Sequence, residues 1–187
     1  MNSDNEKELI RHIKNGKPEA FSVLVHLHQD AVFSLIQQIV SSPEDAEELT
    51  QDVFIKAFKK IGSFRGESAF ATWLYRIACN TAISATRKRK WNFMNLEDKA
   101  LNNIPDEVVD ELLDRENDEK LLQNITEAIQ KLKPDEKALI SLYYSQGKPV
   151  NEIAGITKFS PENVKVKLFR TRKKIALYIN QAQDETR

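Results

Sequence analysis

Apolar residues recur along most of the chain at spacings of three and four, the period of an α-helix with one buried face. No stretch alternates apolar and polar residues in the way a half-buried strand would. The first stripe predicts a helix over residues 21–39, with Phe21, Leu24, Val25, Val32, Leu35, Ile36 and Ile39 on its inner face. Only five Gly and six Pro occur in 187 residues, so little interrupts this pattern. The fold is therefore expected to be all-α.

Local signals mark where the predicted helices begin and end. Ser42, followed by proline and two acids, predicts a capped helix start, because its hydroxyl can accept from a first-turn amide. That helix is expected to end at Gly62, and a polar loop of residues 63–67 leads to a second cap at Ser68. A further helix then runs toward a basic block. Together these elements form the first predicted domain, residues 1–90.

A second helical unit follows a change in composition. Residues 91–118 lose the helical period and gather acids, which predicts a linker. The period resumes in residues 119–187, the second predicted domain, where Pro134 opens a helix. A short helix over residues 150–156, a turn and a capped helix over residues 160–179 complete this domain. That order is the layout of a helix-turn-helix, whose second helix binds in the major groove of DNA.

The position of the charges changes what the net charge implies. The chain has 28 Lys+Arg and 28 Asp+Glu, and a net charge of zero argues against a nucleic-acid-binding protein. However, residues 87–90 are four consecutive bases, residues 97–119 hold ten acids against two bases, and residues 158–174 hold seven bases against one acid. Blocks of one sign create strong local potentials whatever their sum. A single block is as readily a solvated helix face, but two basic blocks favour nucleic acid.

The last predicted helix combines an apolar stripe with a polar surface that suits DNA. Val164, Leu168 and Ile175 can face inward. Side chains that neutralise phosphates or reach base edges cover the remaining surface, namely Asn163, Lys165, Lys167, Arg170, Arg172, Lys173 and Lys174. The alternative is an ordinary basic helix packed in a helical hairpin.

The helix that ends the first domain combines aromatic and basic residues. Aromatic rings can stack on unpaired bases, and the candidates are Phe64, Phe70, Trp73 and Tyr75. Basic and amide side chains can hold a strand, and the candidates are Arg76, Asn80, Arg87 and Lys88. An aromatic stripe at helical spacing more often belongs to a core, and Phe70, Trp73 and Ile77 are assigned mainly to it.

The sequence carries no catalytic or metal-binding signature. Its three histidines form no metal spacing with the single cysteine, Cys79, which is expected to be a small buried hydrophobe. No glycine-rich loop is present to cradle phosphate. We therefore expect no enzymatic activity, no metal and no cofactor. No apolar run approaches the roughly 18 residues of a membrane span, and the N-terminus lacks a secretory core, so a cytoplasmic protein without membrane insertion is expected.

Two whole strings resemble a known family. DAEELTQDVFIKAFKKIGSFRGESAFATWLYRIACNTAISATRKR resembles region two of bacterial extracytoplasmic-function (ECF) sigma factors, members of the sigma-70 superfamily. KLKPDEKALISLYYSQGKPVNEIAGITKFSPENVKVKLFRTRKKI resembles their region four. The resemblance covers nearly the whole chain in the family's order. It implies a dissociable subunit that directs RNA polymerase to promoters.

The resemblance also implies a role for each helix. The helix matching DAEELTQDVF docks on the clamp helices of the largest polymerase subunit, which maps to Asp45, Glu48, Gln51, Asp52 and Phe54. The next loop and helix recognise and melt the minus-ten element, which maps to Phe64, Arg65, Ser68, Phe70, Arg76, Asn80, Ser84, Arg87 and Lys88. The last helix reads the minus-thirty-five element, which maps to Ser160, Asn163, Lys165, Lys167, Arg170, Arg172 and Lys173. The implied partners are core RNA polymerase, including its flap, promoter DNA and an anti-sigma factor.

Two positions depart from the family's pattern. Ser84 stands where Asp or Asn is usual. Lys158 stands in the helix-turn-helix turn where Gly is usual, and a non-glycine residue at positive φ is unfavourable. We therefore expect the turn to be rearranged and to use Gly155. From the residues alone, two other classes stay open: a stand-alone helix-turn-helix regulator and a helical interaction adaptor without a DNA role.

Overall fold

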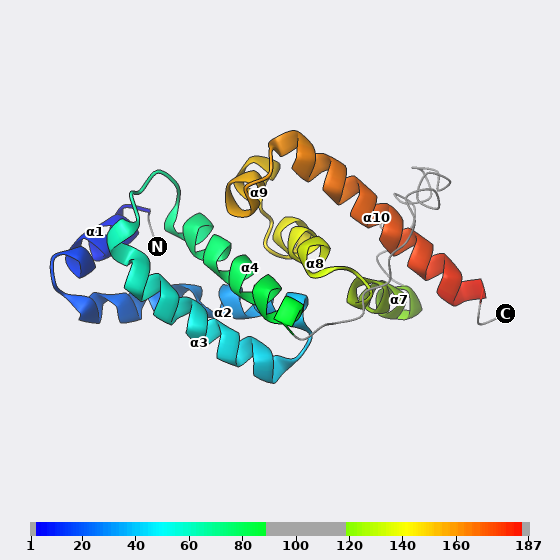
Figure 1. The fold of residues 1–187 in the computed structure, drawn as a ribbon, viewed down its shortest axis with the longest axis horizontal. Coiled ribbons are helices and arrows are strands. Elements are labelled where there is room, and N and C mark those ends of the chain that lie inside the picture. Colours follow the sequence, from blue (N-terminus) through cyan, green and yellow to red (C-terminus); the bar gives the residue numbers. More distant parts are fainter. Residues whose placement is uncertain (1–2, 89–118, 185–187) are drawn as a thin grey trace.

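The computed structural model describes residues 3–88 and 119–184, and in these ranges the chain folds into helices without a strand (Figure 1). The first half contains α1 (Ser3–Lys14), η1 (Pro18–Ala20), α2 (Phe21–Val40), α3 (Pro43–Lys60), η2 (Ile61–Ser63) and α4 (Phe70–Lys88). The second half contains α7 (Glu119–Gln130), α8 (Pro134–Ile140), η3 (Ser141–Ser145), α9 (Val150–Thr157) and α10 (Pro161–Asp184). The all-α prediction is confirmed for the described ranges, and the predicted linker lies outside them.

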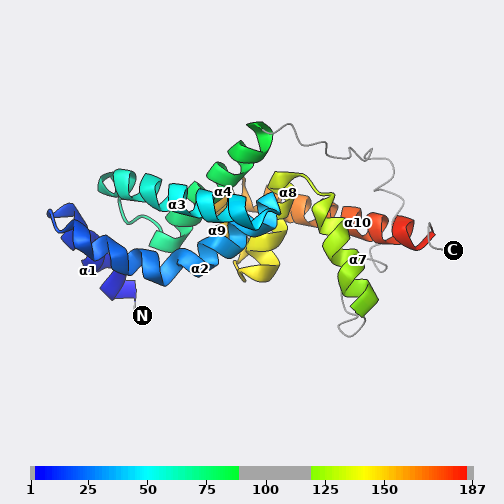
Figure 2. The ribbon, with the colours of Figure 1, turned by 90° about the horizontal axis from the view of Figure 1, so that it is seen from below.

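The core of the first half lies between α2, α3 and α4, and α1 packs beside α2 (Figure 2). The predicted inner stripe of α2 is confirmed, since Leu24, Val32 and Leu35 are fully buried. Their partners on the other two helices are mostly small, which lets the backbones approach closely. Those partners are Ala46, Val53 and Ala57 from α3 and Leu74, Ala78 and Ala82 from α4.

In the second half, α7, α8 and α9 pack along α10. Val164, Leu168 and Ile175 face inward as predicted, and all three are buried. The helix extends to Asp184, beyond the predicted end at residue 179.

Two of the three predicted serine caps are confirmed. The Ser42 hydroxyl accepts from the Asp45 amide at 3.2 Å, and the Ser160 hydroxyl accepts from the Asn163 amide at 3.2 Å. The cap at Ser68 is wrong: its hydroxyl donates to the Ala69 carbonyl, and α4 begins at Phe70.

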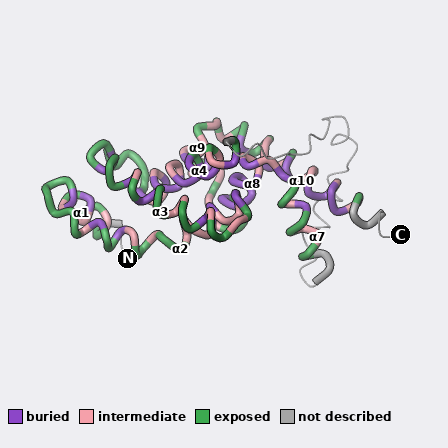
Figure 3. The backbone as a smooth tube through the Cα atoms, turned by 60° about the horizontal axis from the view of Figure 1, so that its bottom comes forward, coloured by how far each residue is buried: buried purple, intermediate pink, exposed green. Residues whose placement is uncertain are grey.

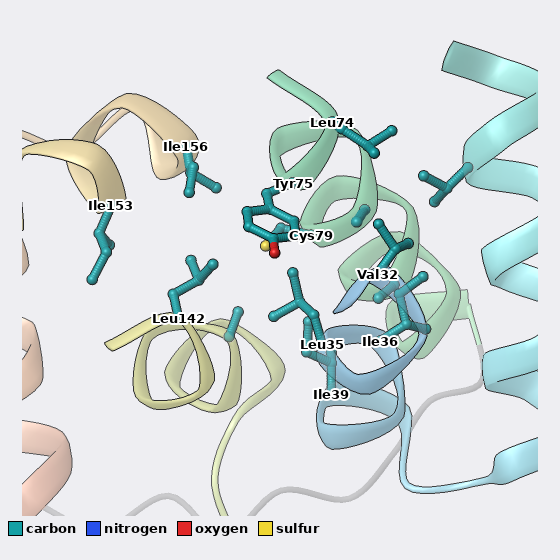
Figure 4. Packing of buried hydrophobic residues seen from close by; sticks show 14 of the residues in the cluster. Val32, Leu35, Ile36, Ile39, Leu74, Tyr75, Cys79, Leu142, Ile153 and Ile156 are labelled. Carbon is teal, nitrogen blue, oxygen red and sulfur yellow. The ribbon is translucent and has the colours of Figure 1, made fainter. Parts of the chain in front are cut away.

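The described parts of the two halves share one hydrophobic cluster (Figure 3). α4 packs on α8 and α9, and α2 packs on α8. Leu142, Ile153 and Ile156 lie opposite Tyr75 and Cys79 of α4 (Figure 4). The described parts of the two predicted domains, 1–90 and 119–187, are therefore in contact with each other through apolar side chains.

Candidate nucleic-acid interface

The outward face of α3 carries most of the residues predicted to bind polymerase. Glu48, Gln51 and Asp52 are exposed, and Asp45 is half-buried in the first turn. Phe54 differs, since it is 7% exposed and its ring packs edge-to-face on another core phenylalanine. The Phe54 side chain therefore belongs to the core and is not presented to a partner.

Sequence reasoning missed two apolar residues on that outward face. Ile55 is 52% exposed and Phe58 is 42% exposed. Both fall outside the inner stripe of α3, and this position off the stripe is the signal that could have identified them. The face is therefore acidic in its first turns and both apolar and basic toward its end, where Lys59 and Lys60 are exposed as well.

A pocket of about 420 Å³ lies between the loop of residues 63–68 and the first turns of α4. Arg65, Ser68 and Arg76 contribute polar groups to its lining. Its aromatic side is a cluster in which the Phe64 ring lies 5.3 Å from Trp73 and 5.8 Å from Phe70. Phe64 and Phe70 are buried, whereas Trp73 is half-buried. The two phenylalanines therefore support the pocket, and Trp73 is the ring available to a base.

Of the DNA-contacting residues predicted on α4, three are exposed and one is hydrogen-bonded to the second half. Asn80, Ser84 and Arg87 are exposed and, at spacings of four and three, share one side of the helix. Asn80 and Ser84 line a second pocket of about 380 Å³ between α3 and α4. The guanidinium of Arg76, in contrast, donates to the Gly155 carbonyl in the second half, with an Nε–O distance of 3.1 Å. The side chain of Lys88 lies outside the described residues.

Tyr75 and Cys79 face the second half. The Tyr75 hydroxyl donates to Gln146 Oε1 at 3.0 Å, and the ring is 5% exposed, so it cannot stack on a base here. Burial, followed by the charge of Glu152, raises the pKa of Tyr75. The expectation that Cys79 is buried is confirmed, and burial raises the pKa of its thiol to about 12.

The residues predicted on α10 form a basic face along the helix. Ser160, Asn163, Lys165 and Arg170 are exposed. The other three, Lys167, Arg172 and Lys173, are half-buried. The Lys167 and Lys173 ammonium groups lie 4.7 and 4.6 Å from the ring centroids of phenylalanines on or beside the same helix. These cation–π contacts hold both charges close to the helix surface.

The turn between α9 and α10 is not rearranged, so that expectation is wrong. Lys158 itself takes the left-handed conformation, with φ +64°, and its amide donates to the Ala154 carbonyl at 2.9 Å. Gly155 lies inside α9. A left-handed residue is the usual way to end a helix and satisfy its last carbonyls, and the turn retains it despite the Cβ of lysine.

Neither a metal-binding cluster nor a membrane-spanning helix is found in residues 3–88 and 119–184. There, no three His, Cys, Asp or Glu side chains gather into a possible metal site. Within the same residues, none of the helices combines the length and apolar character needed to cross a bilayer.

Comparisons with known proteins match two regions of one family, which follow one another along the chain. Residues 24–92 match the family model of sigma-70 region 2, and residues 122–175 match that of sigma-70 region 4. The chain is 34% identical over 176 residues to the ECF RNA polymerase sigma-E factor of Haemophilus influenzae, covering 91% of this chain and 93% of that protein. It is 29% identical over 185 residues to the RNA polymerase sigma-H factor of Pseudomonas aeruginosa, covering 94% of each.

Solved structures share the fold. The structure of CnrH in complex with the cytosolic domain of CnrY superposes with a TM-score of 0.67 at 20% identity, covering 96% of this chain and 99% of that chain. The sigma factor RpoE of Bartonella quintana, in complex with the anti-sigma factor NepR, gives a TM-score of 0.62 at 22% identity, covering 86% and 96%. With two regional models in the expected order and relatives matched over nearly their full length, this chain belongs to the sigma-70 family, among the ECF sigma factors.

Proposed function

We propose that the chain binds core RNA polymerase reversibly and directs it to specific promoters. The exposed face of α3 binds the clamp helices of the largest subunit. The loop pocket and α4 hold and melt the minus-ten element, and the basic face of α10 binds the minus-thirty-five element. Core polymerase supplies the polymerisation chemistry.

The observation that carries the proposal is the match to sigma-70 regions 2 and 4 on a chain whose surfaces fit the three tasks. An acidic helix face that ends in exposed Ile55 and Phe58 suits a basic, partly apolar protein helix rather than DNA. A pocket with Trp73 and Arg76 suits an unstacked base. The exposed bases of α10 suit phosphates and base edges.

Two further partners follow by family membership. We propose that region 4 binds the polymerase flap and that an anti-sigma factor controls the free chain in the cytoplasm. Two solved structures with this fold are complexes, one of CnrH with the cytosolic domain of CnrY and one of the sigma factor RpoE with the anti-sigma factor NepR.

The test is transcription by purified protein with sigma-free core polymerase on a genomic promoter library. Transcripts with defined start sites are expected only when the chain and core polymerase are both present. Specific DNA binding without transcripts would instead indicate a stand-alone regulator, and neither activity would indicate an interaction adaptor.

Variants of α3 test the polymerase surface. Glu48→Lys with Asp52→Lys is expected to weaken core binding at least tenfold, since both side chains are exposed and Asp52 makes only an exposed pair with Lys56 at 3.7 Å. Asp45 is less suitable, because reversing its charge in the first turn would also destabilise the helix. Glu127→Lys, an exposed acid near the end of α7, is the control. Equal core affinity in the double variant and the control would contradict the assignment.

A further inference from the structure

A pocket between α1 and the loop after α3 has a strongly basic lining. Its volume is about 260 Å³, and it is lined by Lys7, Ile10, Arg11, Lys14, Asn15, Phe64, Arg65 and Gly66. Among these residues there are four cations and no carboxylate. The three bases of α1 follow one another at spacings of four and three, which places them on one side of the helix. Arg65 meets them from the loop.

This basic pocket adjoins the proposed base pocket. Both are lined by Phe64, Arg65 and Gly66, so the same three loop residues form a wall of each. Lys14 Nζ donates to the Phe64 carbonyl and ties α1 to the loop.

The two arginines of the basic pocket are paired only weakly with neighbouring carboxylates. Arg11 pairs with Glu8 at 3.5 Å and Arg65 pairs with Glu67 at 3.8 Å, and all four side chains are more than half exposed. Pairs of this kind contribute about 0–1 kcal/mol. An incoming phosphate, which accepts two parallel bonds from a guanidinium, can therefore replace them.

We propose that this pocket binds the phosphodiester backbone of single-stranded DNA beside the nucleotide held in the loop pocket. The proposal rests on the proposed function and extends the DNA path onto α1. A strand that crosses the loop places a base on one side of residues 64–66 and a neighbouring phosphate on the other. Phosphate contacts of this kind fix register and carry no sequence preference.

The experiment uses holoenzyme and a fork-junction DNA whose non-template minus-ten strand is unpaired. Arg11→Gln combined with Arg65→Gln is expected to weaken binding at least fivefold for every sequence. It is also expected to reduce the magnitude of the salt slope by about 0.7 for each lost phosphate contact. Lys17→Gln, an exposed lysine outside the pocket, is the control. The single variant Arg11→Gln changes the basic pocket but not the base pocket, so it distinguishes a loss of phosphate binding from a loss of base binding.

Methylphosphonates placed one at a time along the unpaired strand identify the phosphate. One or two positions are expected to weaken the wild type but not the double variant. Unchanged affinity and slope in the double variant, or equal sensitivity to every neutralised phosphate in both proteins, would overturn the proposal. Failure of the proposed function is distinguishable, because the wild-type holoenzyme would then give no promoter-specific transcripts.

An independent observation concerns the contact between α4 and the second half. Thr72, Tyr75, Arg76 and Cys79 follow one another at helical spacing and form one face of α4. The Thr72 hydroxyl donates to Glu152 Oε1 at 2.9 Å, in addition to the Tyr75 and Arg76 bonds described above.

The same contact continues from α2 onto α8 and η3. Ser145 donates to Gln38 at 3.0 Å, and Lys137 Nζ donates to Ser41 at 3.1 Å. Ile153, Ile156 and Leu142 are 0–2% exposed beneath these bonds. The arrangement, with α9 against the start of α4, is therefore held by polar and apolar contacts together.

This arrangement conflicts with the DNA role of Arg76. Its guanidinium lines the loop pocket, yet it is bound to the Gly155 carbonyl. Its Nε and Nη2 both donate to that carbonyl, so in this arrangement only Nη1 is left to bind a DNA strand. We infer that the contact between α4 and α9 is an autoinhibitory latch, and that the halves must separate before the minus-ten element can be melted.

Gly155 offers a position for a disulfide across the latch. A Cβ added at Gly155 would lie 3.7 Å from Thr72 Cγ2, and its φ is not in the left-handed region. A disulfide needs Cβ atoms about 3.5–4.5 Å apart, and the Thr72 Cβ lies more than 4 Å from the added Cβ, so a small approach of the two helices closes the bridge. Thr72→Cys with Gly155→Cys, in a Cys79→Ala background, is therefore expected to close the latch covalently on oxidation.

The oxidised variant is expected to lose at least tenfold in open-complex formation with core polymerase, and a reductant is expected to restore it. The single cysteine variants, treated with the same oxidant, are the controls. Full activity of the oxidised form would overturn the latch, and so would failure of the disulfide to form in the free chain. Inactivity of the reduced variant and of the wild type would instead count against the proposed function.

Discussion

At the residue scale, two non-glycine residues end helices in the left-handed conformation. Lys158 has φ +64° and Ser41 has φ +66°. The left-handed region costs a residue with a Cβ about 1–2 kcal/mol. Ser41 offsets part of this cost through its hydroxyl, which donates to Gln130 and accepts from Lys137. Side-chain bonding is therefore one difference between the two strained positions.

Lys158→Gly is expected to raise the free energy of unfolding by about 1 kcal/mol, since glycine adopts this conformation without a steric penalty. Ser41→Gly should gain less, because its side-chain bonds are lost. Urea denaturation measures both. Lys165→Gly, in an exposed helix interior, is the control and should lose about 1 kcal/mol. A loss of stability in Lys158→Gly would contradict the argument.

Lys137 makes the free energy of unfolding depend on pH. Burial lowers its pKa from 10.5 to about 8. Between these values the unfolded chain holds the proton and the folded chain does not, so this term increases stability as pH rises. Below about pH 8 both states are protonated and the burial penalty is complete.

Lys137→Met removes this term. The stability of the variant relative to wild type is therefore expected to fall by on the order of 1–3 kcal/mol between about pH 7.5 and about pH 10. Urea denaturation at several pH values measures the difference, in which the titration of all other groups cancels. A difference that does not change with pH would contradict it.

At the scale of the element, three apolar residues that lie close together in the sequence of α3, Phe54, Ile55 and Phe58, differ in the side of the helix that they occupy. Phe54 faces the core, whereas Ile55 and Phe58 face outward. A helix face changes by about 100° at each residue, so neighbours in sequence have different roles. We propose that Ile55 and Phe58, rather than Phe54, make the apolar contact with the polymerase.

Ile55→Ser is therefore expected to weaken core-polymerase binding at least fivefold while leaving the free energy of unfolding within about 0.5 kcal/mol of wild type. Phe54→Ala should do the reverse and lose about 3–5 kcal/mol of stability. Binding titrations with core polymerase and urea denaturation separate the effects. Normal core affinity in folded Ile55→Ser would remove the apolar contact from the interface.

The helix α10 has a similar division, which sharpens the choice of DNA-binding variants. Lys165 and Arg170 are exposed, whereas Lys174 bonds with Glu136 in a mostly buried pair. Lys165→Glu with Arg170→Glu is expected to weaken holoenzyme binding to minus-thirty-five DNA and to flatten its salt dependence. Lys174→Gln should mainly destabilise the fold. Unchanged DNA affinity and salt slope in the double variant would place the recognition surface elsewhere.

At the scale of the whole molecule, periodicity predicted the helices well but not how they meet. The stripes of α2, α3 and α10 and the caps at Ser42 and Ser160 follow from local physics, so the sequence was sufficient for them. A stripe shows that a face is buried, not which element buries it. Tyr75 and Arg76 were therefore assigned to DNA, although both contact the second half.

Two further features have the same cause. Whether Lys158 adopts a left-handed turn depends on how α9 and α10 are held by their surroundings, which composition does not report. The basic pocket on α1 forms only because the loop at Phe64 folds back onto that helix. Patterns along the sequence therefore do not predict the features that are formed by segments far apart in the chain.

The latch has a consequence for how the protein would respond to ionic strength. Each hydrogen bond described across it joins two neutral groups or one charged group with a neutral partner, as between Arg76 and Gly155. Such bonds are little affected by screening, whereas binding to phosphates weakens steeply with added salt. A higher salt concentration would therefore loosen the hold of the opened chain on promoters, while the latch of the free chain would stay closed. The latched free chain would therefore keep its conformation over a range of salt concentrations in which promoter binding changes strongly.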